Sequence, residues 1–215
     1  MTTDEDPGRL ASRRPLGSRN ATWARSLARW AARAGITPNQ ISQASVGFAA
    51  LGAGLFALSP FAPGWLQGVL MLLAAGACQA RLVCNLIDGM VAIEGGQGAK
   101  DGPFWNEAPD RVSDLLLFSG AGIAAGNPTL GLIAAALAIA TAYLRELGRA
   151  EGFAADFSGP MAKPQRMAAL TIGTIIAAFF ATKWTLTLTL WIIVAGTVLT
   201  IALRARRLLA ALNAR

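Results

Sequence analysis

The chain has 215 residues, of which 54% are hydrophobic and only 14% are charged. A soluble domain usually carries about a quarter charged residues, so this composition, with repeated apolar runs of about 20 residues, predicts a multi-pass membrane protein. The runs are continuous rather than alternating, which favours helices over a β-barrel. The net charge of +7 does not form a basic stripe with interleaved aromatic residues, so we expect no nucleic-acid partner. The absence of histidine excludes histidine-ligated zinc and histidine-based catalysis.

The chain is expected to divide into four parts. These are a disordered polar tail, an amphipathic interfacial helix, a six-helix transmembrane catalytic domain and a basic cytoplasmic tail, at residues 1–20, 21–36, 37–206 and 207–215. The six membrane spans are predicted at about 39–58, 65–92, 106–125, 129–149, 165–183 and 185–204. The predicted fold class is therefore an all-α integral membrane protein.

Residues 21–36 have the pattern of an amphipathic helix. Trp23, Leu27 and Trp30 share one helical face, and Arg25 and Arg29 lie on another. This arrangement is typical of a helix that lies on the cytoplasmic surface of a membrane. A helix packed against the rest of the protein is the alternative.

The distribution of basic residues predicts the orientation in the membrane. With six spans and both termini inside, Lys183 is the only one of the 19 lysines and arginines that falls on the outer side. Cytoplasmic loops carry an excess of lysine and arginine, so we expect a multi-pass protein of the cell (inner) membrane with both termini in the cytoplasm. The arginines of the last span are expected to be membrane anchors only: Arg204, Arg206, Arg207 and Arg215.

A polar cluster is predicted at the cytoplasmic ends of the second and third spans. Asn85 and Asp88 share one helical face, and Asn106, Asp110 and Asp114 share another. Ionisable groups in a membrane bundle turn inward, and carboxylates that approach each other repel unless a cation lies between them. Oxygen ligands suit Mg²⁺ or Mn²⁺, so we expect one or two such ions.

A network of salt bridges is the alternative explanation for these acids. In that case they would be neutralised by three arginines of the neighbouring helices: Arg81, Arg111 and Arg145.

The segment from Asn85 to Asp110 resembles the signature of the CDP-alcohol phosphotransferase family, D-x2-D-G-x2-A-R-x8-G-x3-D-x3-D. Five residues match it in order and in spacing: Asp88, Gly89, Ala92, Gly102 and Asp110. Two signature acids are replaced by Asn85 and Asn106, and the signature arginine by Ile93. The chain thus resembles a variant branch of the family with asparagine at two aspartate positions.

The resemblance implies a membrane transferase of phospholipid biosynthesis. Such an enzyme moves a phosphatidyl-type group from a CDP-linked lipid, such as CDP-diacylglycerol, to an alcohol and releases CMP. The residues that it implies for the metal are Asp88, Asp110, Asn85 and Asn106, and Asp110 would also be the general base. Gly89, Ala92 and Gly102 would make room for the nucleotide. Because amides carry no charge, we expect weaker metal binding than four carboxylates would give. Membrane lipids are expected to surround the protein, and its glycine- and alanine-rich helix faces permit a homodimer.

A second polar cluster is predicted at the same side of the membrane, on the fourth and fifth spans. Its members are expected to contact phosphate, either on the nucleotide or on a phosphorylated acceptor: Arg145, Lys163, Gln165 and Arg166. Asp114 and Arg111 are expected to support the site.

Two other functions remain open from the sequence. A non-catalytic relative that binds CDP-linked lipid, or a small transporter, would explain the two amides and would not release CMP. A membrane prenyltransferase also binds a diphosphate between polar helix faces, but it would release pyrophosphate. It would give no role to Gly89, Ala92 and Gly102.

Overall fold

The part of the chain that the structure describes is mostly helical and contains no strand. The computed structural model describes residues 21–94, 100–180 and 183–215, so the predicted disordered tail lies outside it. The helices are α2 (Thr22–Arg33), α3 (Pro38–Leu58), the 3₁₀ turn η2 (Ser59–Phe61), α4 (Gly64–Glu94), α5 (Gly102–Ala124), α6 (Pro128–Ala150), α7 (Lys163–Phe180) and α8 (Lys183–Asn213). The all-helical prediction is confirmed for these residues.

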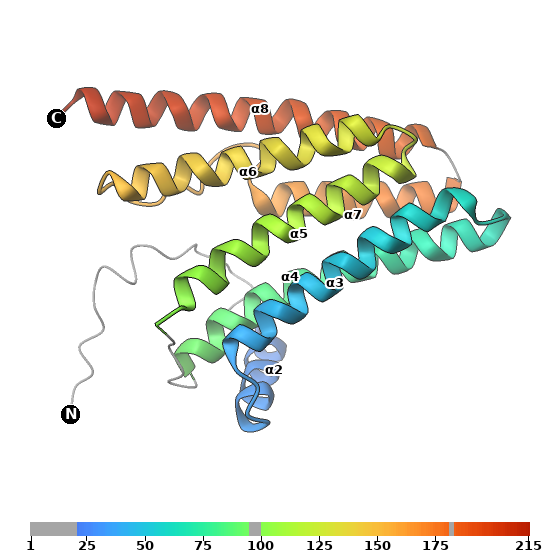
Figure 1. Ribbon diagram of the computed structural model, residues 1–215, viewed down its shortest axis with the longest axis horizontal. Helices are drawn as coiled ribbons and strands as arrows, with labels where there is room; N and C mark the ends of the chain where they lie inside the picture. Colours follow the sequence, from blue (N-terminus) through green and yellow to red (C-terminus); the bar gives the residue numbers. More distant parts are fainter. Residues whose placement is uncertain (1–20, 95–99, 181–182) are drawn as a thin grey trace.

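The six long helices pack side by side around one apolar core. Helix α3 contacts α4 and α5, α6 contacts α5 and α8, and α7 contacts α4 and α8. In Figure 1, α8 lies at one edge of the bundle, α3 and α4 lie at the other, and the short α2 lies beside the end of α4. The core is built mostly from alanine, leucine and phenylalanine side chains, including Phe56, Leu117, Phe118 and Leu170. The small side chains allow the helices to approach closely.

Glycines bring α5 into close contact with its neighbours. A Cβ added at Gly131 of α6 would lie 2.4 Å from the backbone oxygen of Phe118 on α5. A Cβ added at Gly120 of α5 would lie 2.7 Å from the Cα of Ala53 on α3. The apolar half of α5 is therefore held against α3 and α6 by close backbone contacts.

Helix α3 begins with a reciprocal cap. The hydroxyl of Thr37 accepts a hydrogen bond from the amide of Gln40 at 3.3 Å, and the side chain of Gln40 accepts one from the amide of Thr37 at 2.9 Å. Pro38 occupies the first turn, where its missing N–H costs nothing. Pro128 is in the first turn of α6, as the sequence predicts.

Helix α5 begins earlier than the prediction of about residue 106. It starts at Gly102, and Asp101 just before it accepts hydrogen bonds from Trp105 at 2.9 Å and from Asn39 of α3 at 3.2 Å. These contacts tie the first turn of α5 to the start of α3. Because α5 begins at Gly102, Pro109 does not lie in its first turn. It is buried inside the helix, where it cannot donate to the carbonyl four residues before it.

Helix α2 packs on α4 through a row of alanines. Ala24, Ala28 and Ala31 are buried against a cluster on α3 and α4 that consists of Ile41, Leu86, Ile87, Met90 and Val91. Trp23 and Trp30 remain 51% and 59% exposed. The sequence pattern identified the aromatic face but missed the alanine face, because alanine gives almost no periodic signal of its own.

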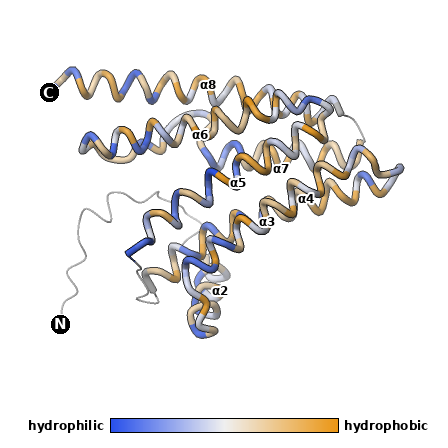
Figure 2. The backbone as a smooth tube through the Cα atoms, in the orientation of Figure 1, coloured by the Kyte–Doolittle hydropathy of each residue, from blue (hydrophilic) through white to orange (hydrophobic). Residues whose placement is uncertain are grey.

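Four of the described helices are long and apolar enough to cross a membrane: Pro38–Phe61, Gly64–Ala92, Pro128–Ala150 and Trp184–Asn213. Helix α5 carries four charged residues in its first half, and α7 has only 18 residues and begins with Lys163 and Arg166 in its first turns. Figure 2 shows that hydrophilic residues gather at the end of the bundle where α5 begins and where α6 and α8 end.

Candidate functional site

The polar ends of α4 and α5 meet inside the bundle, where α3 and α7 complete the site. Asp88 on α4 is 7% exposed and accepts a hydrogen bond from the Ser42 hydroxyl of α3 at 2.8 Å. One turn earlier, the carbonyl oxygen of Asn85 accepts a hydrogen bond from the Ser45 hydroxyl at 3.1 Å. Two serines on one face of α3 therefore orient the two polar side chains of α4.

Asp110 on α5 is the centre of the cluster. Its Oδ1 accepts a hydrogen bond from Nη2 of Arg81 at 3.1 Å and another from the amide nitrogen of Asn85. Its Oδ2 pairs with the ammonium of Lys163 at the start of α7. The carboxylate thus joins α4, α5 and α7, and its side chain is 12% exposed.

Asp114 lies one helical turn further along α5 and is completely buried. It pairs with Arg81 at 3.2 Å and with Arg166 of α7 at 3.5 Å. The guanidinium of Arg166 also donates to the hydroxyl of Thr141 at 3.2 Å and to the carbonyl of Met161 at 3.1 Å. Because every one of these residues is held by its neighbours, this inner layer is suited to fixing the geometry of the layer above it.

Several buried donors of this inner layer have no partner among the described residues. They are Nε and Nη1 of Arg81, Nε of Arg166 and the hydroxyl of Ser113. A buried N–H without an acceptor is costly, so these atoms are available to a bound anion or to water.

The three buried acids are not equally neutralised. Asp110 and Asp114 each pair with two cations, which is the arrangement that the salt-bridge alternative predicts for Arg81. Asp88 forms no ion pair within the described residues, and its hydrogen-bond donors are the Ser42 hydroxyl and the Gly89 amide. An isolated buried carboxylate is expensive, so Asp88 is the point at which a cation would be bound most favourably.

The donor set fits one hard cation better than two. No group of three acidic, histidine or cysteine side chains comes together among the residues that the structure describes. The oxygens of Asp88 and Asp110 suit Mg²⁺ or Mn²⁺, and Asn85 contributes an uncharged amide. A single ion beside Asp88 is therefore compatible with the residues present.

Asn106 is not drawn into this cluster. It is exposed, and its amide donates to its neighbour Glu107 at 3.4 Å. Glu107 in turn pairs with Arg111 at 2.5 Å and with Arg145 of α6. Arg111 and Arg145 thus neutralise Glu107 rather than the inner acids, which corrects their part in the salt-bridge alternative.

The remaining predicted residues are glycines with open space around them and residues that are half-buried or exposed. A Cβ added at Gly89 or Gly102 would meet nothing within 4 Å, so each glycine faces open space. Ala92 is half-buried near the end of α4, and Gln165 is exposed in the first turn of α7. Open space beside Asp88 is what the predicted nucleotide contact requires.

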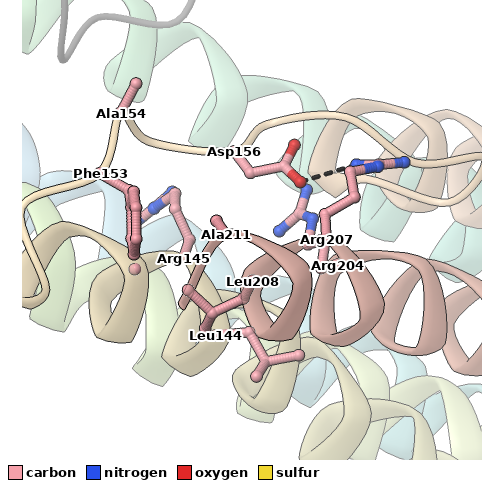
Figure 3. A pocket seen from close by; sticks show the side chains of 10 residues that line it. Leu144, Arg145, Phe153, Ala154, Asp156, Arg204, Arg207, Leu208 and Ala211 are labelled. Carbon is pink, nitrogen blue, oxygen red and sulfur yellow. Dashed lines mark hydrogen bonds and ion pairs between the residues drawn. The ribbon is translucent and has the colours of Figure 1, made fainter. Parts of the chain in front are cut away.

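A separate pocket of about 150 Å³ lies between the ends of α6 and α8. Figure 3 shows Arg145, Arg204 and Arg207 around it. Asp156, in the loop between α6 and α7, pairs with Arg207 at 2.7 Å. Arg145 also lies over the ring of Phe157, with 5.3 Å from its guanidinium carbon to the ring centroid. Arg145 also pairs with Glu107 of the acid-bearing helix α5, so it links this pocket to that helix.

The expectation that Arg204 is only a membrane anchor is wrong. Its side chain is buried and donates to the carbonyls of Ser158 and Thr141, each at 2.9 Å. It therefore fastens the 151–162 loop between α6 and α8. No pattern in the sequence reveals this role, because the partners are backbone carbonyls far away in the chain.

Sequence reasoning also missed Ser42 and Ser45, and it considered Arg81 only in the alternative. The signal for the serines was available, since two small polar residues three apart in an apolar helix mark one face. Arg81 offered a stronger signal, because an arginine in the middle of an apolar run needs a buried partner.

The comparisons with known proteins agree with the predicted chemistry. No family model matches the chain. Over 190 residues it is 27% identical to the phosphatidylinositol phosphate synthase of Mycolicibacterium smegmatis, covering 84% of this chain and 81% of that protein. It is also 27% identical over 128 residues to the enzyme of the same name from Mycobacteroides abscessus, covering 56% and 57% of the two chains. Phosphatidylinositol phosphate synthases belong to the CDP-alcohol phosphotransferase family. The predicted class of enzyme is confirmed at the level of these relatives.

Solved structures share the fold. The crystal structure of Mycobacterium tuberculosis phosphatidylinositol phosphate synthase with manganese and citrate has a TM-score of 0.73 at 20% identity, covering 86% of this chain and 88% of that one. The same protein with CDP-DAG bound has a TM-score of 0.73 at 21% identity, covering 87% and 94%. The helical bundle described above is therefore an arrangement already known from experiment.

Proposed function

We propose that this chain is a membrane transferase that moves the phosphatidyl group of CDP-diacylglycerol to a polyol phosphate and releases CMP. The observation that carries the proposal is the meeting of Asp88 and Asp110 in one buried site, with Gly89 and Gly102 leaving open space beside it. The curated relatives and the CDP-DAG-bound structural neighbour support the choice of donor.

In the membrane, we propose six crossings formed by α3 to α8, with both termini in the cytoplasm. The charged ends of α5 and α7 then reach the cytoplasmic surface, where a water-soluble acceptor and CMP exchange with solvent. Helix α2 would lie in the interface with Trp23 and Trp30 in the lipid, because its alanine face is already covered. A homodimer stays a prediction.

For the donor, we propose that the cytidine lies beside Gly89, Ala92 and Gly102 and that the diphosphate lies over Asp88 and Asp110. A divalent ion would be held beside Asp88, with Asp110 as its second acidic ligand, because the predicted amide ligands Asn85 and Asn106 already have other hydrogen-bond partners. The structural neighbour with manganese supports Mg²⁺ or Mn²⁺ as the cofactor. When bound, such an ion supplies positive charge to the diphosphate and to the departing CMP.

Asp110 is proposed to accept the proton of the acceptor hydroxyl. Its Oδ2 contacts Lys163 and keeps a further lone pair for that proton. The deprotonated acceptor oxygen forms a bond to the phosphatidyl phosphorus, and the bond from that phosphorus to CMP breaks, with its electron pair leaving on CMP. Arg81 and Asn85 hold the carboxylate in place for the transfer. Asp114 supports the site by fixing Arg81, and Arg111 supports it by fixing Glu107.

For the phosphates, we propose that the basic residues at the ends of α6 and α7 contact either the phosphate of the acceptor or the diphosphate of the donor. Arg145 and Lys163 are only partly buried, and Gln165 is exposed, so all three are within reach of solvent. Arg166 is buried and already bonded to Asp114 and Thr141. It would contact a phosphate only after these buried contacts rearrange. Because the relatives are named for phosphatidylinositol phosphate, inositol phosphate is the first acceptor to test.

The test is CMP release by purified protein in lipid vesicles that contain CDP-diacylglycerol and Mg²⁺ or Mn²⁺. A panel of polyols, polyol phosphates and amino alcohols is added one compound at a time. Release that requires both a metal and one acceptor supports the proposal, and the compound identifies the acceptor.

The ion pairs on Asp110 favour one second candidate, a relative that binds CDP-linked lipid without turning it over. Donor binding without CMP release for any acceptor would favour that candidate.

A further inference from the structure

We infer that Lys163 is a built-in cation that takes the place of a second metal ion, by bridging Asp110 and the diphosphate of the donor. The site accordingly binds at most one divalent ion, beside Asp88. This inference deepens the proposed function and rests on it for the identity of the donor.

The contacts of Asp110 leave little room for a second metal ion. Arg81 and Asn85 donate to one carboxylate oxygen, and the ammonium of Lys163 pairs with the other. The side chains of Lys163 and Asp110 are only 17% and 12% exposed, and that of Arg81 is fully buried. Cations in such a place are not displaced cheaply, because the carboxylate would lose partners that water cannot replace.

Asn85 points to the same conclusion. Its amide nitrogen donates directly to Asp110 and its carbonyl accepts a hydrogen bond from Ser45, so both polar groups of this side chain already have protein partners. A carboxylate at position 85 would repel Asp110 unless a cation separated them. An amide removes the repulsion and adds a hydrogen bond. Asparagine at this position therefore suits a site in which residues 85 and 110 do not share a metal.

The charges inside the bundle already balance. The buried acids are Asp88, Asp110 and Asp114, and the cations that contact the last two are Arg81, Lys163 and Arg166. The diphosphate of the donor carries about one negative charge per phosphate. One divalent ion balances those charges, whereas a second would leave an excess of two positive charges in a site with little water.

Lys163 is placed to replace the missing ion. An ammonium has three N–H donors, and Asp110 accepts one of them. Lys163 stands in the first turn of α7 and its side chain is 17% exposed, so a ligand can reach it. Its other N–H groups are free to donate to a phosphate oxygen, which is the bridge between carboxylate and phosphate that a metal ion would otherwise make.

The first test counts ions without any turnover. Mn²⁺ is titrated into purified, metal-free protein in detergent and followed by electron paramagnetic resonance, for the wild type, Lys163→Met, Lys163→Arg and the exposed-lysine control Lys100→Met. We expect at most one Mn²⁺ per chain in the wild type, Lys163→Arg and Lys100→Met, and a second Mn²⁺ in Lys163→Met. Two ions in the wild type, or no additional ion in Lys163→Met, would overturn the inference.

The second test measures donor binding in the presence of a chelator. Lys163→Met should weaken the binding of CDP-diacylglycerol on the order of tenfold, the effect of losing a charged hydrogen bond, while Lys163→Arg and Lys100→Met bind as the wild type does. Equal binding by Lys163→Met would contradict the bridge to the diphosphate. Neither measurement depends on CMP release, so a failure of the proposed reaction would be seen separately from a failure of this inference.

Discussion

Replacing Arg81 by methionine should be among the most damaging single changes in this chain. Arg81 is fully buried and pairs with two buried carboxylates, those of Asp110 at 3.1 Å and Asp114 at 3.2 Å. Removing one partner of a buried ion pair costs about 3–5 kcal/mol. Because Asp110 keeps Lys163 and Asp114 keeps Arg166, we expect the lower end of that range, about 3 kcal/mol. This is a large part of a typical stability of about 5–15 kcal/mol.

The assay is reversible unfolding in mixed micelles, followed by far-ultraviolet circular dichroism. Arg111→Met is the matched control, because Arg111 is 22% exposed and its partner Glu107 keeps Arg145, so its loss should cost less than about 1 kcal/mol. Adding Asp114→Asn to Arg81→Met should recover part of the lost stability, since one unpaired buried charge disappears. An Arg81→Met protein as stable as Arg111→Met would refute the buried network.

Three further changes test the packing and the loops. Gly131→Ala should lower the melting temperature, because its Cβ would meet a backbone oxygen of α5 at 2.4 Å, whereas Gly47→Ala has no neighbour within 4 Å and should leave the melting temperature unchanged or raise it slightly. Thr37→Ala removes the cap of α3 and should cost about 1 kcal/mol in the same unfolding assay, and an unchanged midpoint would contradict the cap. Partial burial raises the pKa of Asp156, but hydrogen bonds from Ser158 and Arg207 outweigh it and hold the pKa below its usual value. Its stabilising contribution should therefore be present at neutral pH and be lost in strong acid, so the melting temperatures of Asp156→Asn and the wild type should differ at pH 7 and converge as the pH falls through that lowered pKa.

Much of the fold was predictable because membrane helices are long and strongly apolar. The predicted spans overlap α3 to α8 along most of their lengths. Helix ends were less predictable, because they depend on contacts between distant segments. The early start of α5 follows from the hydrogen bond between Asp101 and Asn39, which no local pattern reveals. Helix α8 likewise continues to Asn213, past the predicted end of the sixth span at about residue 204.

The sequence predicts which polar residues of the candidate site share a helix face, but not which of them contact each other. Spacing places Asn85 with Asp88 and Asn106 with Asp110, and Asn85 does reach Asp110. Spacing cannot say that Asn106 lies on the exposed edge of that face, beside Glu107. It also cannot say which cation meets which acid, since that depends on how the helices are rotated against each other.

The central claim is that Asp110 takes part in transfer of the phosphatidyl group. Its most direct test is CMP release from CDP-diacylglycerol in vesicles, comparing the wild type with Asp110→Asn, with donor binding measured on both proteins. The account predicts acceptor-dependent release by the wild type and no turnover by Asp110→Asn, which still binds donor. Turnover by Asp110→Asn at the rate of the wild type would contradict the account.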